Sequence, residues 1–431
     1  MVLFTRDLRV RDNPALAAAA RDAAEVVPVF VLDPAILETP FGRSANRRRF
    51  LAQSLTDLDQ SLRQLGSSLV VRRGDTATEL AALAPDAVYA AEDASAQAQA
   101  REQRLADRFD LRLLPSATAV AFDDLKTYRV FTPYFRAWSD VPLRAVEDAP
   151  RLGAHGVEPG RLPVVATGRS PEAAAGGERA GRVRLDWWLS AGLARYGRAR
   201  GGDDLAADHT SRLSPYLHFG CISALECVRR ARETGDGADW IRELCWRDFY
   251  AQLLRAFPQT SRADLYDRAY ARGWSGPAFD AWREGRTGYP LVDAGMRQLA
   301  REGWMHNRAR LVTASFLVKD LGVDWRHGAA WFEELLLDGD VASNRGNWQW
   351  VAGTGVDHTQ GGRMFNPTLQ AKRRDPRGDY VRRYVPELAH LEPRQIHEPW
   401  KLGSVAGYAE PIVDHAEVAS RRRRGEQPTL F

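Results

Sequence analysis

Cysteine and methionine are scarce in this chain of 431 residues, which has three of the first and four of the second. Cys221, Cys227 and Cys245 have an odd count and no metal-site spacing, which argues against a disulfide framework. No apolar run approaches the roughly 20 residues that a membrane-spanning helix needs, and no secretory signal is visible at the N-terminus. The sequence therefore predicts a cytoplasmic protein with reduced thiols and no membrane segment.

Excess charge of one sign is also missing. The 60 Lys and Arg residues nearly balance the 56 Asp and Glu residues, which leaves a formal net charge of +4. This charge permits a polyanionic partner without requiring one. The basic run Arg421–Arg424 near the C-terminus is most simply a solvated tail.

Tryptophan is absent from residues 1–137. None of the 13 tryptophans precedes Trp138, and the other 12 lie between Trp187 and Trp400. A chain of this length exceeds one ordinary hydrophobic core. The length and the uneven composition together predict two different domains.

Short apolar runs alternate with helical patterns in residues 1–125, which we expect to form an α/β domain. Strands are predicted at Val2–Phe4, Val26–Leu32, Leu69–Val71, Ala87–Ala91 and Leu111–Leu114, with helices at Asn13–Ala24, Ser44–Leu65, Thr76–Leu83 and Ala96–Arg108. Apolar strands separated by helices predict a five-stranded parallel, Rossmann-like sheet that is covered on both faces. No Gly-x-Gly-x-x-Gly follows the first strand, so ordinary dinucleotide binding there lacks its phosphate loop.

The rest of the chain divides into a connector and a helical part. Residues 126–182 are predicted to be an interdomain connector: Lys126–Trp138 is aromatic and basic, and Ser139–Arg182 is rich in Pro, Gly and Ala and lacks sustained periodicity. Residues 183–431 show helical patterns without β-like alternation, which predicts an all-α domain. Its helices are expected at Leu185–Tyr196, Ile222–Glu233, Ala238–Ala256, Pro277–Glu284, Tyr289–Glu302, His306–Leu321 and Trp325–Leu336. No Ser/His/Asp triad is evident, and the nine histidines lack metal-ligand spacing, so we expect no metal.

Two segments of the helical part could bind a ligand. Hydroxyls, backbone amides and Arg212 gather at Thr210–Ser214 ahead of a helix, where an anion is favoured, although a plain capping segment explains them too. On the predicted helix Ala238–Ala256, Glu243, Trp246, Arg247 and Tyr250 share one face. That face suits a flat, hydrogen-bonding guest such as a nucleobase, or is simply the charged side of an amphipathic helix.

The stretch Gly303–Phe365 combines aromatic and polar residues most densely. It contains Trp304, Trp325, Trp348, Trp350, Asn307, Arg310, Asp338, Asp340 and Asn344. A helical aromatic core would explain the tryptophans, but buried Asn, Asp and Arg are costly unless each is paired or bound. The aspartates follow an apolar helix, whose dipole opposes them, so we expect partners such as Arg310 for Asp338. The stretch predicts the floor of a cofactor site.

Taken in order along the chain, these segments resemble the photolyase/cryptochrome family. The resemblance rests on Phe4–Pro14, Thr210–Ser214, Trp246–Tyr250, Thr287–Asp293, Gly303–Arg308, Asp338–Asp340, Asn347–Trp350 and Phe365–Pro367. Each segment alone is a weak signal, whereas all of them in this order are specific. The resemblance implies an α/β antenna domain and a helical domain that holds FAD.

The resemblance also implies roles for individual residues. Those that would contact FAD are Tyr196, Thr210, Ser211, Arg212, Leu213, Ser214, Trp240, Arg310, Asp338, Gly339, Asp340 and Asn344. Asn344 would face the flavin nitrogen whose protonation follows reduction. Trp348, Trp325 and Trp274 would carry an electron from the surface to photoexcited flavin.

In the DNA-repair members of the family, a flipped-out pyrimidine dimer enters a cavity, which implies a DNA partner here. Glu243, Trp246, Asn307 and Trp350 would line that cavity, and base stacking is worth about 1–3 kcal/mol per base. Glu243 would donate to a dimer carbonyl when protonated or accept from an amide when ionised. Arg200, Arg247 and Arg308 would contact backbone phosphates.

A few positions bear on the lesion and on the alternatives. Six-four photoproduct enzymes carry histidine where Asn307 stands, and plant-type cryptochromes carry aspartate where Asn344 stands, so the resemblance favours light-driven repair of cyclobutane dimers over photoreception. Leu311 replaces a usual methionine, Val356 replaces a usual threonine, and His358–Arg363 is atypical, so other lesions stay open. The pattern near Ala90–Arg104 lacks the Asn-Glu pair associated with folate, which favours a deazaflavin antenna over folate, with flavin or no antenna also open. We expect a monomer.

Overall fold

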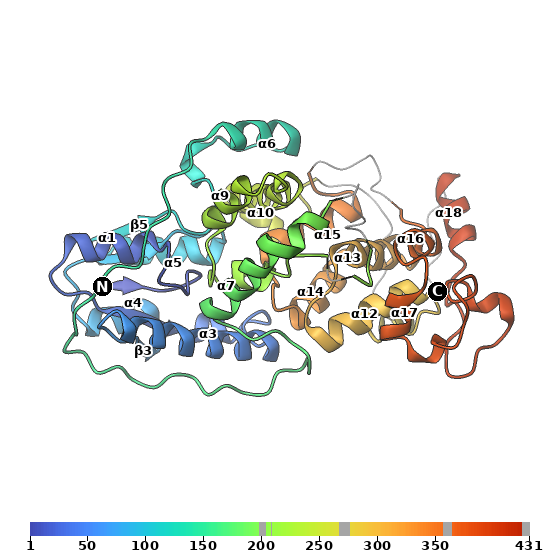
Figure 1. Ribbon diagram of the computed structural model, residues 1–431, viewed down its shortest axis with the longest axis horizontal. Helices are drawn as coiled ribbons and strands as arrows, with labels where there is room; N and C mark the ends of the chain where they lie inside the picture. Colours follow the sequence, from blue (N-terminus) through green and yellow to red (C-terminus); the bar gives the residue numbers. More distant parts are fainter. Residues whose placement is uncertain (198–203, 208, 267–275, 357–363, 425–431) are drawn as a thin grey trace.

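A parallel sheet forms the N-terminal part of the computed structural model, which describes residues 1–197, 204–207, 209–266, 276–356 and 364–424 (Figure 1). Its strands are β1 (Val2–Leu3), β2 (Pro28–Leu32), β3 (Val70–Arg73), β4 (Val88–Ala91) and β5 (Leu111–Leu114). They pair in the order β3-β2-β1-β4-β5, and every pairing is parallel. The predicted five-stranded parallel sheet is confirmed.

Apolar clusters cover both faces of the sheet. Successive residues of a strand point to opposite faces and therefore join different clusters. On β2, Phe30 and Leu32 join one apolar cluster, whereas Val29 and Val31 join another. Helices α1 (Pro14–Asp22) and α3 (Ala45–Gln64) contribute to the first cluster; α4 (Thr76–Ala82) and α5 (Ala96–Ala106) contribute to the second. Helix α1 begins as its sequence predicts, since Asn13 accepts from Leu16 N at 3.0 Å and Pro14 occupies the first turn.

The segment between the sheet and the main helical part wraps around the α/β fold. It begins with α6 (Phe131–Asp140), runs without regular structure to α7 (Glu178–Trp187), and passes along β3 (Figure 1). Pro159 O accepts from Val71 N at 2.7 Å, so the segment covers part of the edge that β3 would otherwise expose. The boundaries at residues 125 and 182 stay a prediction.

Helices form the remainder of the described chain. They are α8 (Ser214–His218), α9 (Ala224–Glu233), α10 (Ala238–Ala256), α11 (Pro277–Arg283), α12 (Pro290–Glu302), α13 (Asn307–Ser315), α14 (Trp325–Leu335), α15 (Val341–Ala352), α16 (Pro367–Arg374), α17 (Asp379–Tyr384) and α18 (His415–Arg423). A helix after Thr210–Ser214 was expected and is present as α8, whereas the sequence did not predict α6 or α15–α18. Helix α7 starts earlier than expected, and it and α13 end in π-helical turns, at Trp188–Gly192 and Phe316–Asp320.

Two large cores meet at the centre of the molecule. The first is continuous from one face of the sheet through α7–α10, and the second joins α11–α17. Helix α15 packs against α10 at Gly346, where a Cβ would lie 2.3 Å from the ring of Tyr250. Within the described ranges, no helix has the length and apolar character needed to cross a membrane.

Candidate functional site

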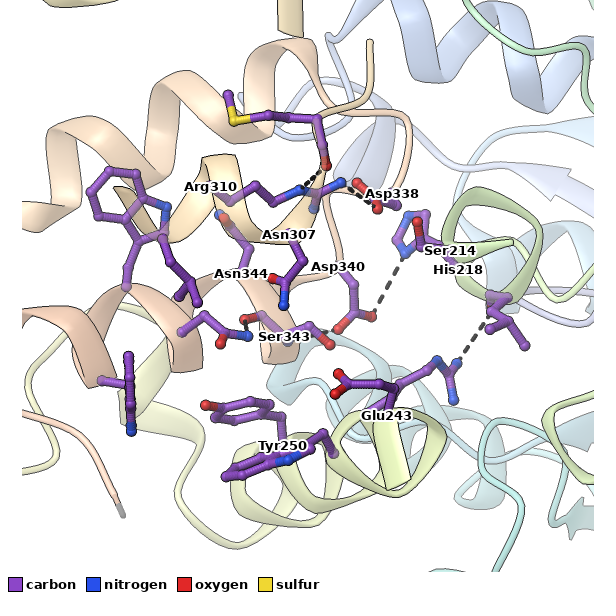
Figure 2. A pocket seen from close by; sticks show the side chains of 18 of the residues that line it. Ser214, His218, Glu243, Tyr250, Asn307, Arg310, Asp338, Asp340, Ser343 and Asn344 are labelled. Carbon is purple, nitrogen blue, oxygen red and sulfur yellow. Dashed lines mark hydrogen bonds and ion pairs between the residues drawn. The ribbon is translucent and has the colours of Figure 1, made fainter. Parts of the chain in front are cut away.

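A cavity of about 1000 Å³ lies where the two cores meet. Helix α10 forms one wall, and α13, α15 and the turns before them form the other (Figure 2). Its lining includes most of the residues singled out in the sequence: Tyr196, Thr210, Ser211, Arg212, Ser214, Trp240, Glu243, Trp246, Arg247, Asn307, Arg310, Asp338, Asp340, Asn344, Trp348 and Trp350. Segments as distant in sequence as Tyr196 and Trp350 therefore share one site.

The expected pairing of Arg310 with Asp338 is present. Arg310 Nη2 lies 2.9 Å from Asp338 Oδ2, and its Nε donates to Met305 O at 2.8 Å. Asp338 Oδ1 is buried without a hydrogen-bond partner in the structure. Because a buried carboxylate oxygen without a donor is costly, this atom indicates a site for a ligand N–H or O–H.

Asp340 is held by a different arginine. Arg6, which follows β1, donates from Nη2 to Asp340 Oδ2 at 2.6 Å, and His218 Nδ1 lies 3.6 Å from the same oxygen. Burial alone would raise the pKa of Asp340, but Arg6 and His218 outweigh it and hold that pKa well below its ordinary value. Burial lowers the pKa of His218 to about 4. Asp340 is therefore an anion with 14% of its side chain exposed, and Arg6 of the α/β part balances its charge.

A carboxylate behind Asn344 orients that side chain. Asn344 Nδ2 donates to Glu333 Oε1 and to Ala329 O, both at 3.1 Å. Arg345 in turn donates to both oxygens of Glu333, at 2.7 and 2.6 Å. With the amide nitrogen engaged on α14, the carbonyl end of Asn344 is the one left to meet a ligand in the cavity.

The loop Thr210–Ser214 is fixed from behind. Arg184 on α7 donates to Ser211 O and to Thr210 O, both at 2.7 Å. Arg212 adopts a left-handed backbone with φ of 52°, pairs with Glu302 at 2.8 Å and lies over the ring of Trp304. Such strain is maintained only where the surroundings enforce it, often at a functional site. Helix α8 after the loop has only five residues, so the helix dipole expected to favour an anion is small.

Helix α10 brings Glu243, Trp246 and Tyr250 to the cavity. One face of the Trp246 ring is covered by Phe131 of α6, with centroids 3.6 Å apart and planes 3° from parallel. Opposite α10, Asn307 begins α13 and Trp350 lies on α15. Leu311, one of the departures from the family pattern, also borders the cavity, whereas Val356 is buried in the core.

Some expected site residues have other positions. Arg247 was expected to contact a DNA phosphate, but its guanidinium is turned inward. It donates to Ala117 O at 2.6 Å and to Leu217 O at 3.2 Å. Leu213 is fully buried in the core and Gly339 packs against Arg47, so neither of these two residues lines the cavity. Arg308 is half-buried outside the lining, and Arg200 lies outside the described residues.

The tryptophans expected to carry electrons are placed in part. Trp348 lines the cavity and its ring packs edge-on against Phe332, 5.0 Å between centroids. A Cβ on Gly328 of α14 would lie 2.2 Å from the Trp348 ring, so this glycine is what lets the indole lie close to α14. Trp325, one turn earlier on α14, is fully buried. Trp274 lies outside the described residues.

A second cavity of about 450 Å³ lies at the carboxyl ends of the strands. Phe4 and Arg6 after β1 and Asp93 after β4 line it, which places it at the switch point of the strand order, where open α/β sheets bind ligands. His218, Arg247 and Asp340 line both cavities. A thin wall of charged and polar side chains therefore separates the two.

Several of these residues were missed in the sequence. Arg6 appeared in the sequence analysis only within the motif Phe4–Pro14. No role was predicted for His218, Arg184, Glu333 or Arg345. Each acts through a partner more than 10 residues away. Only a three-dimensional structure brings such pairs together, because their spacing in sequence has no helical or strand period.

Comparison with known proteins agrees with this architecture. Residues 1–151 match the family model described as DNA photolyase, and residues 240–426 match the FAD binding domain of DNA photolyase. The chain is 48% identical to a deoxyribodipyrimidine photo-lyase of Streptomyces griseus, over 98% of both chains. It is 37% identical to a cryptochrome DASH of Gloeobacter violaceus, over 96% of this chain and 93% of the other.

A solved structure extends the comparison to the fold. An archaeal photolyase from Sulfolobus tokodaii, described with two FAD molecules, superposes with a TM-score of 0.87 at 33% identity, covering 98% of this chain and 99% of the other. The chain belongs to the photolyase/cryptochrome family. It is an enzyme of the photolyase type, with an FAD-binding helical domain.

The cavity fits the flavin cofactor of that family. Its volume suits a large ligand, the unpartnered Asp338 Oδ1 offers an acceptor, and the hydroxyls of Thr210, Ser211 and Ser214 offer donors. Asp338, Asn344 and the loop Thr210–Ser214 are the residues we expect to hold FAD.

Proposed function

We propose that this protein repairs cyclobutane pyrimidine dimers in DNA, using light and reduced FAD. The observation that carries the proposal is the meeting of two residue sets in one cavity. Asp338, Asp340 and Asn344 lie on one side, and Glu243 lies across from them on α10 (Figure 2). A cofactor and the two linked bases of a flipped-out dimer can thus share one cavity.

The lesion would be bound by the α10 and α15 sides. Trp246 and Trp350 offer aromatic faces for the two linked bases, and Phe131 supports the Trp246 ring from behind. Asn307 offers an amide to the base edges. When bound, reduced FAD supplies the light-driven electron that splits the dimer, and Glu243 stabilises the electron-rich dimer by hydrogen bonding.

Electrostatics on the cofactor side support the same proposal. The positive charge of Arg6 stabilises the ionised form of Asp340, and Arg310 provides the counter-charge for Asp338. Asn344, oriented by Glu333, tunes the flavin through its carbonyl end. Trp348 and Trp325 form the inner part of the relay that reloads the cofactor with electrons.

We also propose that the second cavity holds a light-harvesting antenna, with a deazaflavin preferred. The Sulfolobus tokodaii photolyase is described as implying a novel light-harvesting cofactor and as containing two FAD molecules. A flat ring system suits a cavity lined by Phe4, Phe30, Phe41 and Phe122. Absorbance of the purified protein in excess of what its measured flavin content explains would reveal such a second chromophore.

The test of repair is direct. Protein whose flavin is fully reduced is mixed with an oligonucleotide that carries one cyclobutane dimer, and the mixture is illuminated with blue light. We expect intact thymines to be restored only with light. If the DNA is bound and the flavin is reduced but no dimer is lost, the proposal is wrong.

A photoreceptor of the cryptochrome type is the second candidate, because a cryptochrome DASH is among the relatives. Such a protein would keep the flavin side of the cavity but would not need Trp246, Asn307 and Trp350 for a lesion. Affinity for dimer-containing against undamaged duplex separates the two candidates. Repair requires a clear preference for the damaged duplex, whereas equal affinities favour the receptor.

A further inference from the structure

A carboxylate contacts the indole nitrogen of the buried relay tryptophan. Trp325 Nε1 donates to Asp264 Oδ1 at 2.7 Å, and both side chains are sequestered, with 6% of the Asp264 side chain and none of Trp325 exposed. A backbone carbonyl would satisfy an indole N–H equally well, as Thr313 O does for Trp282. A buried carboxylate is the more costly partner, so its presence at this atom calls for a reason.

The position of Asp264 is fixed on both sides by one glutamine. Gln349 of α15 accepts from Leu265 N at 2.9 Å and donates to Ala263 O at 3.2 Å and Thr260 O at 2.8 Å. Gln349 is itself almost fully buried. The loop that carries Asp264 is therefore held against the same helix that carries Trp348, with Asp264 aimed at α14.

Cations surround the Trp325 ring. The guanidinium carbons of Arg326 and Arg345 lie 5.0 and 5.9 Å from its centroid. Two nearby positive charges oppose the formation of a third on the ring. Arg326 also pairs with Asp264 at 3.3 Å. Asp324 and Glu333 offset part of the charge of these two guanidinium groups, and the remainder disfavours a positive charge on Trp325.

We propose that Asp264 is the proton acceptor of Trp325 when this indole gives up an electron. The proposal rests on the proposed function, because the relay is part of it. The N–H of an oxidised indole is far more acidic than that of the neutral ring, and an acceptor at 2.7 Å is within reach for direct transfer.

The step balances as follows. Trp325 passes one electron to oxidised Trp348, which has lost its own to light-excited oxidised flavin, the oxidant of the sequence. The Nε1 proton moves to Asp264 Oδ1, which leaves a neutral indolyl radical and a neutral carboxylic acid. A thiol in solution later returns the electron, and Asp264 returns the proton. The transfer removes the positive charge that Arg326 and Arg345 oppose and slows the return of the electron.

The experiment compares W274F with the double variant W274F/D264N, both loaded with oxidised flavin. Replacing Trp274 makes Trp325 the outermost relay residue, and asparagine still accepts the indole N–H but does not take its proton. After a laser flash, transient absorption distinguishes the neutral tryptophan radical from the cation radical by their spectra. We expect the neutral radical in W274F, formed more slowly in heavy water. In W274F/D264N we expect the cation radical, with a lifetime at least about tenfold shorter.

D324N is the matched control. Asp324 pairs with the same Arg326 at 2.8 Å, whereas the indole N–H of Trp325 donates to Asp264 and not to Asp324. Asparagine caps α14 as well as aspartate does. W274F/D324N should behave like W274F. A readout without flavin is the indole N–H proton resonance of Trp325, assigned with W325F, which should move upfield in D264N because the charge-assisted bond is lost.

Each outcome decides between the alternatives. The same radical spectrum and lifetime with and without D264N would show that Asp264 only anchors its loop. Absence of any tryptophan radical in wild-type protein would overturn the relay and this inference together. Loss of dimer repair with an intact relay would overturn the proposed function alone, because the flash experiment contains no DNA.

Discussion

Arg6 of the α/β part and Asp340 of the helical part form an ion pair of 2.6 Å, although 334 residues separate them. Asp340 lines both the large and the smaller cavity, and Arg6 lines the smaller one. The charge of Asp340 in the large cavity is therefore balanced by an arginine from the domain that carries the smaller cavity. Flavin binding and the packing of the two parts are linked through this contact.

Removing the positive charge of Arg6 should weaken both flavin binding and the packing of the α/β part against the helical part. R6Q leaves Asp340 buried with a hydrogen bond but no full counter-charge, so we expect a loss of about 2–3 kcal/mol in the free energy of unfolding at pH 7. Flavin should also be retained less well during purification. Urea denaturation measures the first effect and the flavin-to-protein absorbance ratio the second.

The effect of R6Q should depend on pH with a definite sign. The native pKa of Asp340 lies well below its ordinary value, with Arg6 the largest cause that lowers it. The stabilisation is therefore complete above about pH 4, the unfolded pKa, and is lost as the pH falls toward the native pKa. R21Q, which breaks the exposed Arg21–Glu147 pair, should change stability by less than about 0.5 kcal/mol at any pH. A difference between R6Q and wild type that grows in acid would contradict this.

Asp248 should show the opposite dependence. Burial raises its pKa to about 6, although Arg247, Trp138 Nε1 and the amides of Ala119 and Val120 lower it. Its native form holds the proton to higher pH than its unfolded form, so its stabilising effect is present below about pH 4 and is lost as the pH rises through 6. Relative to D248N, wild type should lose on the order of 2 kcal/mol between pH 4 and 7.

D239N, at an exposed position on the same helix, provides the control for Asp248. The stability of D239N should run parallel to that of wild type over this range, because this substitution changes an exposed side chain and leaves Asp248 in place. Parallel curves for D248N as well would mean that Asp248 does not titrate as its burial implies. Guanidinium or urea melts at several pH values supply the data.

Glu333 should influence the flavin without touching it. E333Q weakens the bonds to Asn344 Nδ2 and Arg345, so the Asn344 amide loses its fixed orientation. A change of about 1 kcal/mol in a hydrogen bond corresponds to about 40 mV for a one-electron couple. We expect a shift of that order in the flavin potential, measured by spectroelectrochemistry. E334Q, on the exposed neighbour of Glu333, should leave the potential unchanged.

Trp350 should discriminate damaged from undamaged DNA. W350A removes a stacking surface worth about 1–3 kcal/mol, so affinity for a dimer-containing duplex should fall about 5- to 150-fold. Affinity for undamaged duplex should change little, because phosphate contacts dominate it. W350F should recover most of the loss, and W331F, whose ring is outside the cavity, should bind like wild type. An equal loss for both duplexes would argue against base stacking at Trp350.

How far the sequence predicts this molecule depends on the range of each interaction. The strands and α10 follow from local periodicity, and Ala238–Ala256 was predicted with its observed ends. Helix α15 was missed because Asn344, Gly346, Asn347 and the paired tryptophans disguise its amphipathic pattern. It is stabilised instead by close packing of Gly346 on Tyr250 and of Trp348 on Gly328.

The residues of the site also divide into those whose position follows from nearby sequence and those whose position depends on distant contacts. Arg310–Asp338 could be anticipated, because an acidic group after a helix needs a nearby cation. Arg247 could not be placed, since helical spacing gives its face of α10 but not the carbonyls of Ala117 and Leu217 that turn it inward. Asp264 gave no signal, because its meaning comes entirely from the indole that it contacts.

The most direct measurement is the number of dimers lost per light flash in a single-turnover complex. Wild-type protein with fully reduced flavin is saturated with a duplex that carries one cyclobutane dimer, and the recovery of thymine absorbance is followed after each flash. We expect a large part of the bound dimers to be restored, and a clearly smaller part with E243Q, which cannot supply the same hydrogen bonds to the dimer. No recovery in a complex shown to hold both reduced flavin and dimer would contradict dimer repair as the function of this cavity.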